Sequence, residues 1–111
     1  MRYFGGKNRL ANEIVAILNS YRKENQKFIE PFVGGLNIVS KMEGERLAFD
    51  LHYELIELYK AMQNGWIPPD TIDNDTYLKA KNSNNISPAF KAFVGFGCSF
   101  AGKYFGGICK K

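Results

Sequence analysis

The chain is poor in the residues that build metal centres and disulfide scaffolds. It contains two cysteines, Cys98 and Cys109, and a single histidine among its 111 residues. The cysteines lack Cys-x-x-Cys spacing, which excludes a disulfide scaffold, and we expect no metal site. Reduced thiols in a cytoplasm are the default for such a composition, so we expect a cytoplasmic protein.

Long hydrophobic runs are missing as well. No apolar stretch approaches about 18 residues and no signal peptide is recognisable, so nothing points to a membrane or to export. Charge of one sign dominates only slightly, since 15 basic residues stand against 11 acidic ones and leave a net charge of +4. That excess suits a nucleic-acid partner, and ordinary solvated surface explains it equally well.

Strands are the third scarce feature. With 45% apolar and 14% aromatic residues the chain can build a core, and its length suits one small domain. A doubly wound sheet, however, needs several strand–helix–strand units of about 30 residues or more. Only residues 27–30 and 46–49 read as convincing strands. The predicted fold is therefore α/β, a single domain overall, with a short and incomplete parallel sheet flanked by helices.

Apolar residues at helical spacing and capping signals predict the helices. The expected ranges are 8–22, a short helix at 36–43, 53–64, one near 75–82 and one near 89–96. Residues 1–65 form the predicted cofactor-binding α/β part. Residues 66–111 are expected to be a polar connector followed by a helical and glycine–aromatic segment.

Residues 27–52 carry the most informative pattern, in which a strand, a glycine turn, a helix and a second strand end at an acid. Gly34 and Gly35 let the backbone turn tightly after the first strand. Asp50 follows Glu30 by about twenty residues, the distance at which nucleotide-binding α/β units place a carboxylate for ribose hydroxyls. The pattern predicts a nucleoside cradle, with an ordinary strand–helix turn as the alternative.

Three motifs occur in a fixed order. They are Tyr-x-Gly-Gly-Lys at residues 3–7, Glu-Pro-Phe-Val-Gly-Gly at 30–35 and Phe-Asp-Leu-His at 49–52. Together they resemble the Dam-type DNA adenine methyltransferases, which use S-adenosylmethionine to methylate the exocyclic amino group of adenine. The resemblance covers roughly residues 2–66 and continues more loosely to Gly107. It implies a partial Rossmann-like methyltransferase fold and the N-terminal portion of such an enzyme.

The resemblance also implies S-adenosylmethionine as cofactor and double-stranded DNA as partner. Tyr3 and Lys7 would lie beside the adenosine and methionine parts of the cofactor, and residues 32–35 would form the cofactor turn. The family usually has a glycine where Leu36 stands. The implied cofactor-binding residues are Tyr3, Lys7, Glu30, Phe32, Gly34, Gly35 and Asp50.

Basic and aromatic side chains are candidates for contact with DNA. Five glycines interleave with aromatic residues between Gly95 and Gly107, where rings beside a lysine can stack on bases. The alternative is a segment that packs on a core. The candidate DNA-binding residues are Arg9, Lys103 and Tyr104.

The catalytic motif of the family is absent. Dam-type enzymes carry Asp-Pro-Pro-Tyr, or a close variant, at the end of a later strand, whereas the only Pro-Pro here is Pro68-Pro69, followed by Asp70. We interpret this pair as a helix stop. No catalytic residue is assigned, and the chain alone is expected to be inactive.

A different class of function is left open. The alternatives are a non-catalytic remnant that binds nucleoside or DNA, and a structural protein that completes itself by self-assembly. Isolated strands leave open sheet edges, which favour pairing with another chain. We therefore expect a homo-oligomer, with residues 95–107 reaching across.

Overall fold

The computed structural model describes residues 3–109. They form two compact units, each with a core of its own. We call residues 5–51 the strand unit, and residues 52–109 together with Tyr3 and Phe4 the helical unit. The predicted division of the sequence at residue 65 stays a prediction.

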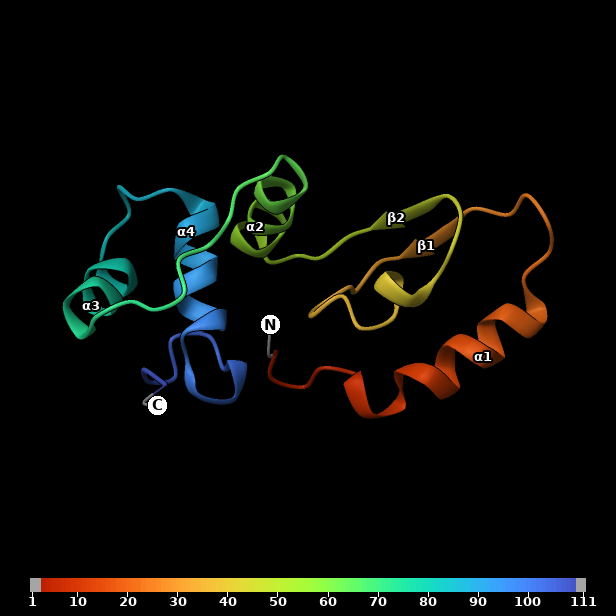
Figure 1. Ribbon diagram of the computed structural model, residues 1–111, viewed down its shortest axis with the longest axis horizontal. Helices are drawn as coiled ribbons and strands as arrows, with labels where there is room; N and C mark the ends of the chain where they lie inside the picture. The colour runs from red at the N-terminus through yellow and green to blue at the C-terminus, as the bar shows by residue number, and fades with distance from the viewer. Residues whose placement is uncertain (1–2, 110–111) are drawn as a thin grey trace. The chain divides into compact units, whose positions relative to one another are not determined.

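The strand unit contains a parallel pair of strands and one long helix (Figure 1). Strand β1 (Phe28–Glu30) pairs with β2 (Arg46–Ala48), and Ile29 lies opposite Leu47. Helix α1 (Ala11–Tyr21) follows a single 3-10 turn at Asn8–Leu10. The short parallel sheet and the helix predicted at 8–22 are confirmed.

The core of the strand unit lies beneath α1. Ala11 of the helix is fully buried against Ile38 and Met42. Partly buried apolar side chains surround these three: Ile14, Val15, Leu18 and Phe28. Leu10, Ile17 and Tyr21, which also fit the predicted apolar face, are exposed instead. The buried stripe is therefore narrower than the sequence pattern indicates.

The helix predicted at 36–43 is wrong except for one 3-10 turn at Val39–Lys41. The backbone of Leu36 is left-handed, with φ of +65°, and a right-handed helix cannot run through such a residue. Ile38 and Val39 are buried, and β-branched residues like these lose side-chain freedom in a helix. The left-handed turn and the burial of Ile38 and Val39 therefore decide the conformation of this segment, although its apolar residues have helical spacing.

The helical unit consists of three helices, with α4 lying between α2 and α3 (Figure 1). They are α2 (Tyr53–Gln63), α3 (Asn74–Asn82) and α4 (Pro88–Ala92), which continues as a π-helix over Phe93–Gly97. The helices predicted at 53–64, 75–82 and 89–96 are confirmed. Within the described residues the protein has a small α/β fold with two parallel strands and four α-helices.

Side-chain caps start α3 and α4. The Asp73 carboxylate accepts a hydrogen bond from the Thr76 amide at 2.7 Å, and the Ser87 hydroxyl accepts one from Phe90 at 3.4 Å. The bonds from Thr76 lower the pKa of Asp73. The core below them joins α2 and α4 through Leu55, Leu58, Ala92 and Phe96.

The segment that follows the π-helix folds back onto the helical unit. Ser99 and Ile108 form an antiparallel bridge, and Phe105 donates a backbone hydrogen bond to the Gly95 carbonyl at 2.9 Å. A β-carbon on Gly95 would lie 2.4 Å from the Tyr104 ring and 2.8 Å from the Phe105 ring. Glycine is therefore required at residue 95, and the aromatic rings pack within their own unit.

Tyr77 fastens this C-terminal segment to α3. Its buried hydroxyl lies 2.8 Å from the Ser99 hydroxyl and accepts a hydrogen bond from the Gly107 amide at 3.0 Å. Replacing Tyr77 by phenylalanine leaves both partners unsatisfied, so we expect a loss of about 1–3 kcal/mol in unfolding free energy. Unfolding in urea, monitored by the fluorescence of Trp66, measures this loss of unfolding free energy. Tyr21→Phe, at an exposed site, is the control, and equal effects of both variants would contradict the role of Tyr77.

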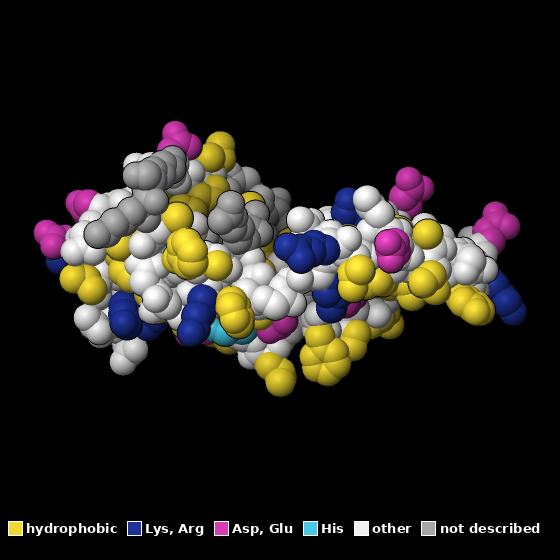
Figure 2. Space-filling model, turned by 90° about the horizontal axis from the view of Figure 1, so that it is seen from below, with side chains coloured by type: hydrophobic (Ala, Val, Ile, Leu, Met, Phe, Trp, Pro, Cys, Tyr) yellow, Lys and Arg dark blue, Asp and Glu magenta, His cyan; other side chains and the backbone are white. Residues whose placement is uncertain are grey.

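The strand unit leaves apolar side chains at its surface, and Figure 2 shows apolar side chains exposed over the molecule. Ile29 and Leu47, paired across the two strands, are 54% and 41% exposed. Phe28 belongs instead to the core under α1, as the alternation of side chains along a strand requires. The sheet thus has one face in the core of its unit and an apolar, exposed second face.

Candidate functional site

The glycine turn after β1 lies at the carboxyl end of two parallel strands, where open α/β sheets bind ligands. Backbone pairing continues past the strands, because Phe49 donates to the Glu30 carbonyl and Val33 to the Phe49 carbonyl, both at 2.8 Å. The Gly34 amide then donates to Oδ2 of Asp50 at 3.1 Å. The turn and the acid that the sequence predicts as a cradle are therefore in direct contact.

The turn has a left-handed backbone. The φ angles of Gly34 and Leu36 are +51° and +65°, and the Leu36 amide closes the turn on the Val33 carbonyl at 3.1 Å. Glycine adopts this conformation freely, whereas another L-residue loses roughly 1–2 kcal/mol. The departure from the family glycine at Leu36 thus leaves the chain in a glycine-like conformation, at an energetic cost.

Variants at Leu36 test this strain. We expect Leu36→Val to lower stability by about 1–2 kcal/mol, because a β-branched residue is disfavoured at positive φ. Leu36→Gly should be tolerated, since its relaxed backbone offsets the entropy it adds to the unfolded chain. The rate of hydrogen exchange at the Phe49 amide measures the stability of the strand unit. The control is Leu51→Val, at a residue 94% exposed and without positive φ. Equal tolerance of valine at both positions would contradict the strain.

Glu30 is a buried acid within this site, with 7% of its surface exposed. The Lys7 ammonium lies 3.1 Å from Oε1 of Glu30 and donates to the Phe32 carbonyl at 3.1 Å. Oε2 of Glu30 is buried and has no hydrogen-bond partner among residues 3–109. Because an unsatisfied buried acceptor is destabilising, the site favours a ligand that brings a hydrogen-bond donor.

The strand unit brings together most of the predicted cofactor residues. Lys7 pairs with Glu30 and the Gly34 amide with Asp50, and Phe32, whose carbonyl accepts from Lys7, is 69% exposed. Gly35 is half-buried in the same turn. Tyr3 belongs to the helical unit, where its ring stacks on Phe96 with centroids 5.1 Å apart.

The predicted DNA-binding residues lie in both units. Arg9 is exposed in the 3-10 turn before α1, and Lys103 is exposed with its ammonium 5.9 Å from the Phe4 ring centroid. Tyr104 is partly buried and packs on Phe96 with ring centroids 4.6 Å apart. Burial, and then the negative charge of Glu54, raise the pKa of Tyr104, so its phenol stays protonated at neutral pH.

His52 has a structural role at the start of α2. Its Nδ1 accepts a hydrogen bond from the Leu55 amide at 3.4 Å and so caps α2. Its ring contacts those of Phe96 and Tyr104 edge-on, at centroid distances of 4.9 and 4.5 Å.

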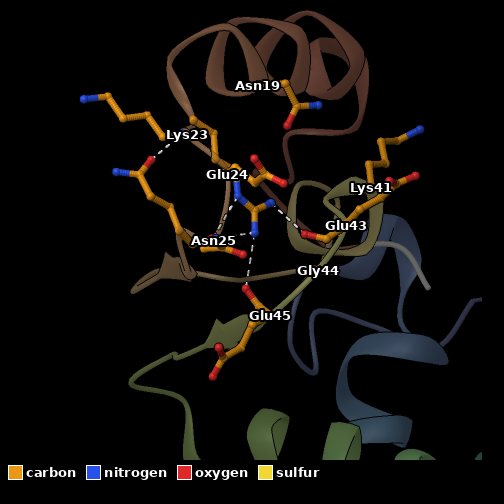
Figure 3. Close-up of a pocket in the computed structure, with 10 residues that line it drawn as sticks. Asn19, Lys23, Glu24, Asn25, Lys41, Glu43, Gly44 and Glu45 are labelled. Carbon is orange, nitrogen blue, oxygen red and sulfur yellow. Dashed lines mark hydrogen bonds between the residues drawn. The ribbon is translucent and has the colours of Figure 1, made fainter.

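A polar groove of about 940 Å³ lies near the opposite ends of the strands, beside the residues that precede β1 and β2 (Figure 3). Arg22 stands in its wall and donates to the carbonyls of Gln26, Glu43 and Glu45. Arg22 is not among the site residues predicted from the sequence. No local pattern reveals it, because two of its three acceptors lie more than twenty positions away in the chain.

None of the helices between residues 3 and 109 has the length and apolar character needed to cross a membrane. The same residues contain no group of three or more His, Cys, Asp or Glu side chains placed to hold a metal ion.

Comparison with known families agrees with the three motifs. The chain matches the family described as D12 class N6 adenine-specific DNA methyltransferase over residues 3–92. No match was found among curated proteins or among solved structures. The matched range includes the glycine turn, Glu30 and Asp50, and it covers most of the chain. The chain therefore belongs to the D12 class N6 adenine-specific DNA methyltransferases, which confirms the resemblance to Dam-type enzymes.

Proposed function

We propose that this chain is the S-adenosylmethionine-binding part of a DNA N6-adenine methyltransferase and that it is inactive alone. The observation that carries the proposal is the buried Oε2 of Glu30, which lacks a partner among the described residues. It lies in the same turn region as Gly34 and Asp50, within the part that matches the family. S-adenosylmethionine, when bound, supplies a methyl group on a cationic sulfonium.

The residues of the turn suit such a ligand. Glu30 would accept a hydrogen bond from the amino group of the methionine part, while Lys7 orients its carboxylate. Asp50 would bind the ribose hydroxyls and already fixes the turn through the Gly34 amide. Gly34 and Gly35 leave room for close approach, and the exposed Phe32 ring offers an apolar surface. On the family pattern Tyr3, a residue of the helical unit, is a cofactor-binding residue as well.

Double-stranded DNA is the proposed partner. The family acts on adenine in DNA, and the net charge of +4 favours a polyanion. Arg9 and Lys103 are exposed and available for phosphate contacts. Tyr104 is proposed to act from its packed position, as part of the surface that presents Lys103 rather than as a free stacking ring.

The exposed apolar face of the sheet supports the proposal that this chain is part of a larger enzyme. Its two strands expose an apolar face at Ile29 and Leu47, and larger parallel sheets of this class cover both faces. The sequence also contains no Asp-Pro-Pro-aromatic motif. No further strand lies among residues 3–109, and the family carries its catalytic motif at the end of a later strand. Together these two features account for the proposed lack of activity.

Cofactor affinity tests the proposed site. We expect Glu30→Gln and Asp50→Ala each to weaken S-adenosylmethionine binding by about 10- to 100-fold, because each removes a charge-assisted hydrogen bond. Titration calorimetry on the full chain gives the dissociation constants. Asp50→Asn, which keeps an acceptor for the Gly34 amide, separates loss of charge from collapse of the turn.

The matched control is Asp70→Ala, which removes an exposed carboxylate outside the site. Its affinity should equal that of the wild type. Far-ultraviolet circular dichroism of every variant checks that the fold is kept. Equal affinity of wild type, Glu30→Gln and Asp50→Ala for S-adenosylmethionine would contradict the assignment of this turn as the cofactor site.

A further inference from the structure

The two cysteines lie opposite each other near the C-terminus of the helical unit. Ser99 and Ile108 form an antiparallel bridge, so the next pair outward is Cys98 and Cys109. The backbone bonds agree, because Cys109 donates to the Cys98 carbonyl at 2.8 Å and Phe100 to the Gly107 carbonyl at 2.9 Å. These bonds lie on either side of the bridge, which places the cysteines in direct register.

Such a pair has the spacing of a disulfide. Directly opposite residues joined by an antiparallel hydrogen bond have α-carbons about 5.5 Å apart. Disulfides join α-carbons that are about 4.4–6.8 Å apart. Both thiols are free in this structure, with Cys98 partly buried and Cys109 exposed. The register therefore places the two α-carbons within the range that a disulfide spans.

The reduced pair is also held in place. The Tyr77 hydroxyl contacts the Ser99 hydroxyl on one side of the bridge and the Gly107 amide on the other. One buried side chain thus fastens both segments that carry the cysteines. Because the backbone is ordered before any bond forms, little conformational entropy remains to be lost on closure.

We propose that Cys98 and Cys109 are a redox modification site that closes residues 98–109 into a disulfide-linked ring. The oxidant is a low-molecular-weight disulfide such as oxidised glutathione. The ring contains Lys103 and Tyr104, two of the proposed DNA-contacting residues. Oxidation would therefore fix the loop that presents them.

The chemistry follows from the exposure of the two thiols. Exposed Cys109 attacks the small disulfide as thiolate, forming a mixed disulfide and releasing one small thiolate. Cys98 then attacks the Cys109 sulfur and releases the second one. The protein thiols lose two electrons and two protons, and the small disulfide takes up both to become two thiols. Burial, and then Cys109, raise the pKa of Cys98, which makes it the resolving rather than the attacking thiol.

Equilibration of the full chain in glutathione buffers tests the proposal. Free thiols, intact mass and peptide mapping are measured at increasing ratios of oxidised to reduced glutathione. We expect both thiols to disappear together, with a Cys98–Cys109 linkage in the monomer. Cys98→Ser and Cys109→Ser should instead give a mixed disulfide with glutathione.

Nearness in sequence alone would also allow some ring closure, so the same equilibrium is measured in concentrated urea. The native fold should favour the disulfide by at least about tenfold over the unfolded chain, because the thiols are already opposed. Tyr77→Phe, which removes the hydrogen bonds to Ser99 and Gly107, should reduce the preference of the native fold for the disulfide. Two glutathione adducts per chain, a disulfide between chains, or equal closure in urea and buffer would each overturn the proposal.

Discussion

Purified protein of residues 1–111 will transfer no measurable methyl group to adenine in double-stranded DNA, even with saturating S-adenosylmethionine. The exocyclic amino group is a weak nucleophile and needs an acceptor beside it, which the family provides through Asp-Pro-Pro-Tyr. The Pro68-Pro69 pair cannot substitute, because it lies between α2 and α3 and no strand ends there. Since enzymes accelerate reactions by a million-fold or more, loss of the acceptor should leave only background transfer.

Transfer of a radiolabelled methyl group to DNA rich in adenine measures this result. A complete adenine methyltransferase, run beside the chain with the same DNA, shows that the assay works. Calorimetry under the same conditions shows whether the chain is loaded with cofactor, so that lack of turnover is not confused with lack of binding. Turnover that Glu30→Gln abolishes would prove the chain active and the prediction wrong.

Replacing Arg22 by methionine should open the strand unit. The guanidinium donates at 2.6 Å to the Glu43 carbonyl and at 2.8 Å to the Gln26 carbonyl, with a longer bond to the Glu45 carbonyl. Gln26 and Glu45 stand just before β1 and β2, so Arg22 holds the starts of both strands together. Because several charge-assisted hydrogen bonds are lost at once, we expect the stability of the strand unit to fall by about 2–4 kcal/mol. A pair of three-residue strands has little else to replace them.

Hydrogen exchange suits this measurement, because a chain of two units need not unfold in one step. The Phe49 amide, bonded to the Glu30 carbonyl, should exchange roughly 30- to 1000-fold faster in Arg22→Met. Lys23→Met, which removes the neighbouring exposed charge, is the control and should leave the rate unchanged. Arg22→Lys should fall between them, since an ammonium cannot reach all three carbonyls as a planar fork does. Unchanged exchange in Arg22→Met would show that the carbonyls are satisfied without it.

Local patterns predicted most of the elements. Helices α1 and α2 follow from apolar residues repeated one turn apart, and α4 from serine and proline at its start. The exception is 36–43, where the pattern is helical and the structure has a single 3-10 turn. The left-handed backbone at Leu36 is imposed by the turn before it, which a search for periodicity does not detect.

The sequence by itself determined the family and most of the elements, and it predicted the residue types of the candidate site, because motif order and short-range periodicity are properties of the chain as written. Only the tertiary structure decided how they meet. The bond from Gly34 to Asp50, the burial of Glu30 beside Lys7 and the clamp of Arg22 join residues far apart in the chain. The opposition of Cys98 and Cys109 is equally invisible in their spacing. Such contacts depend on how strands and turns pack in space, and no local preference of either partner encodes them.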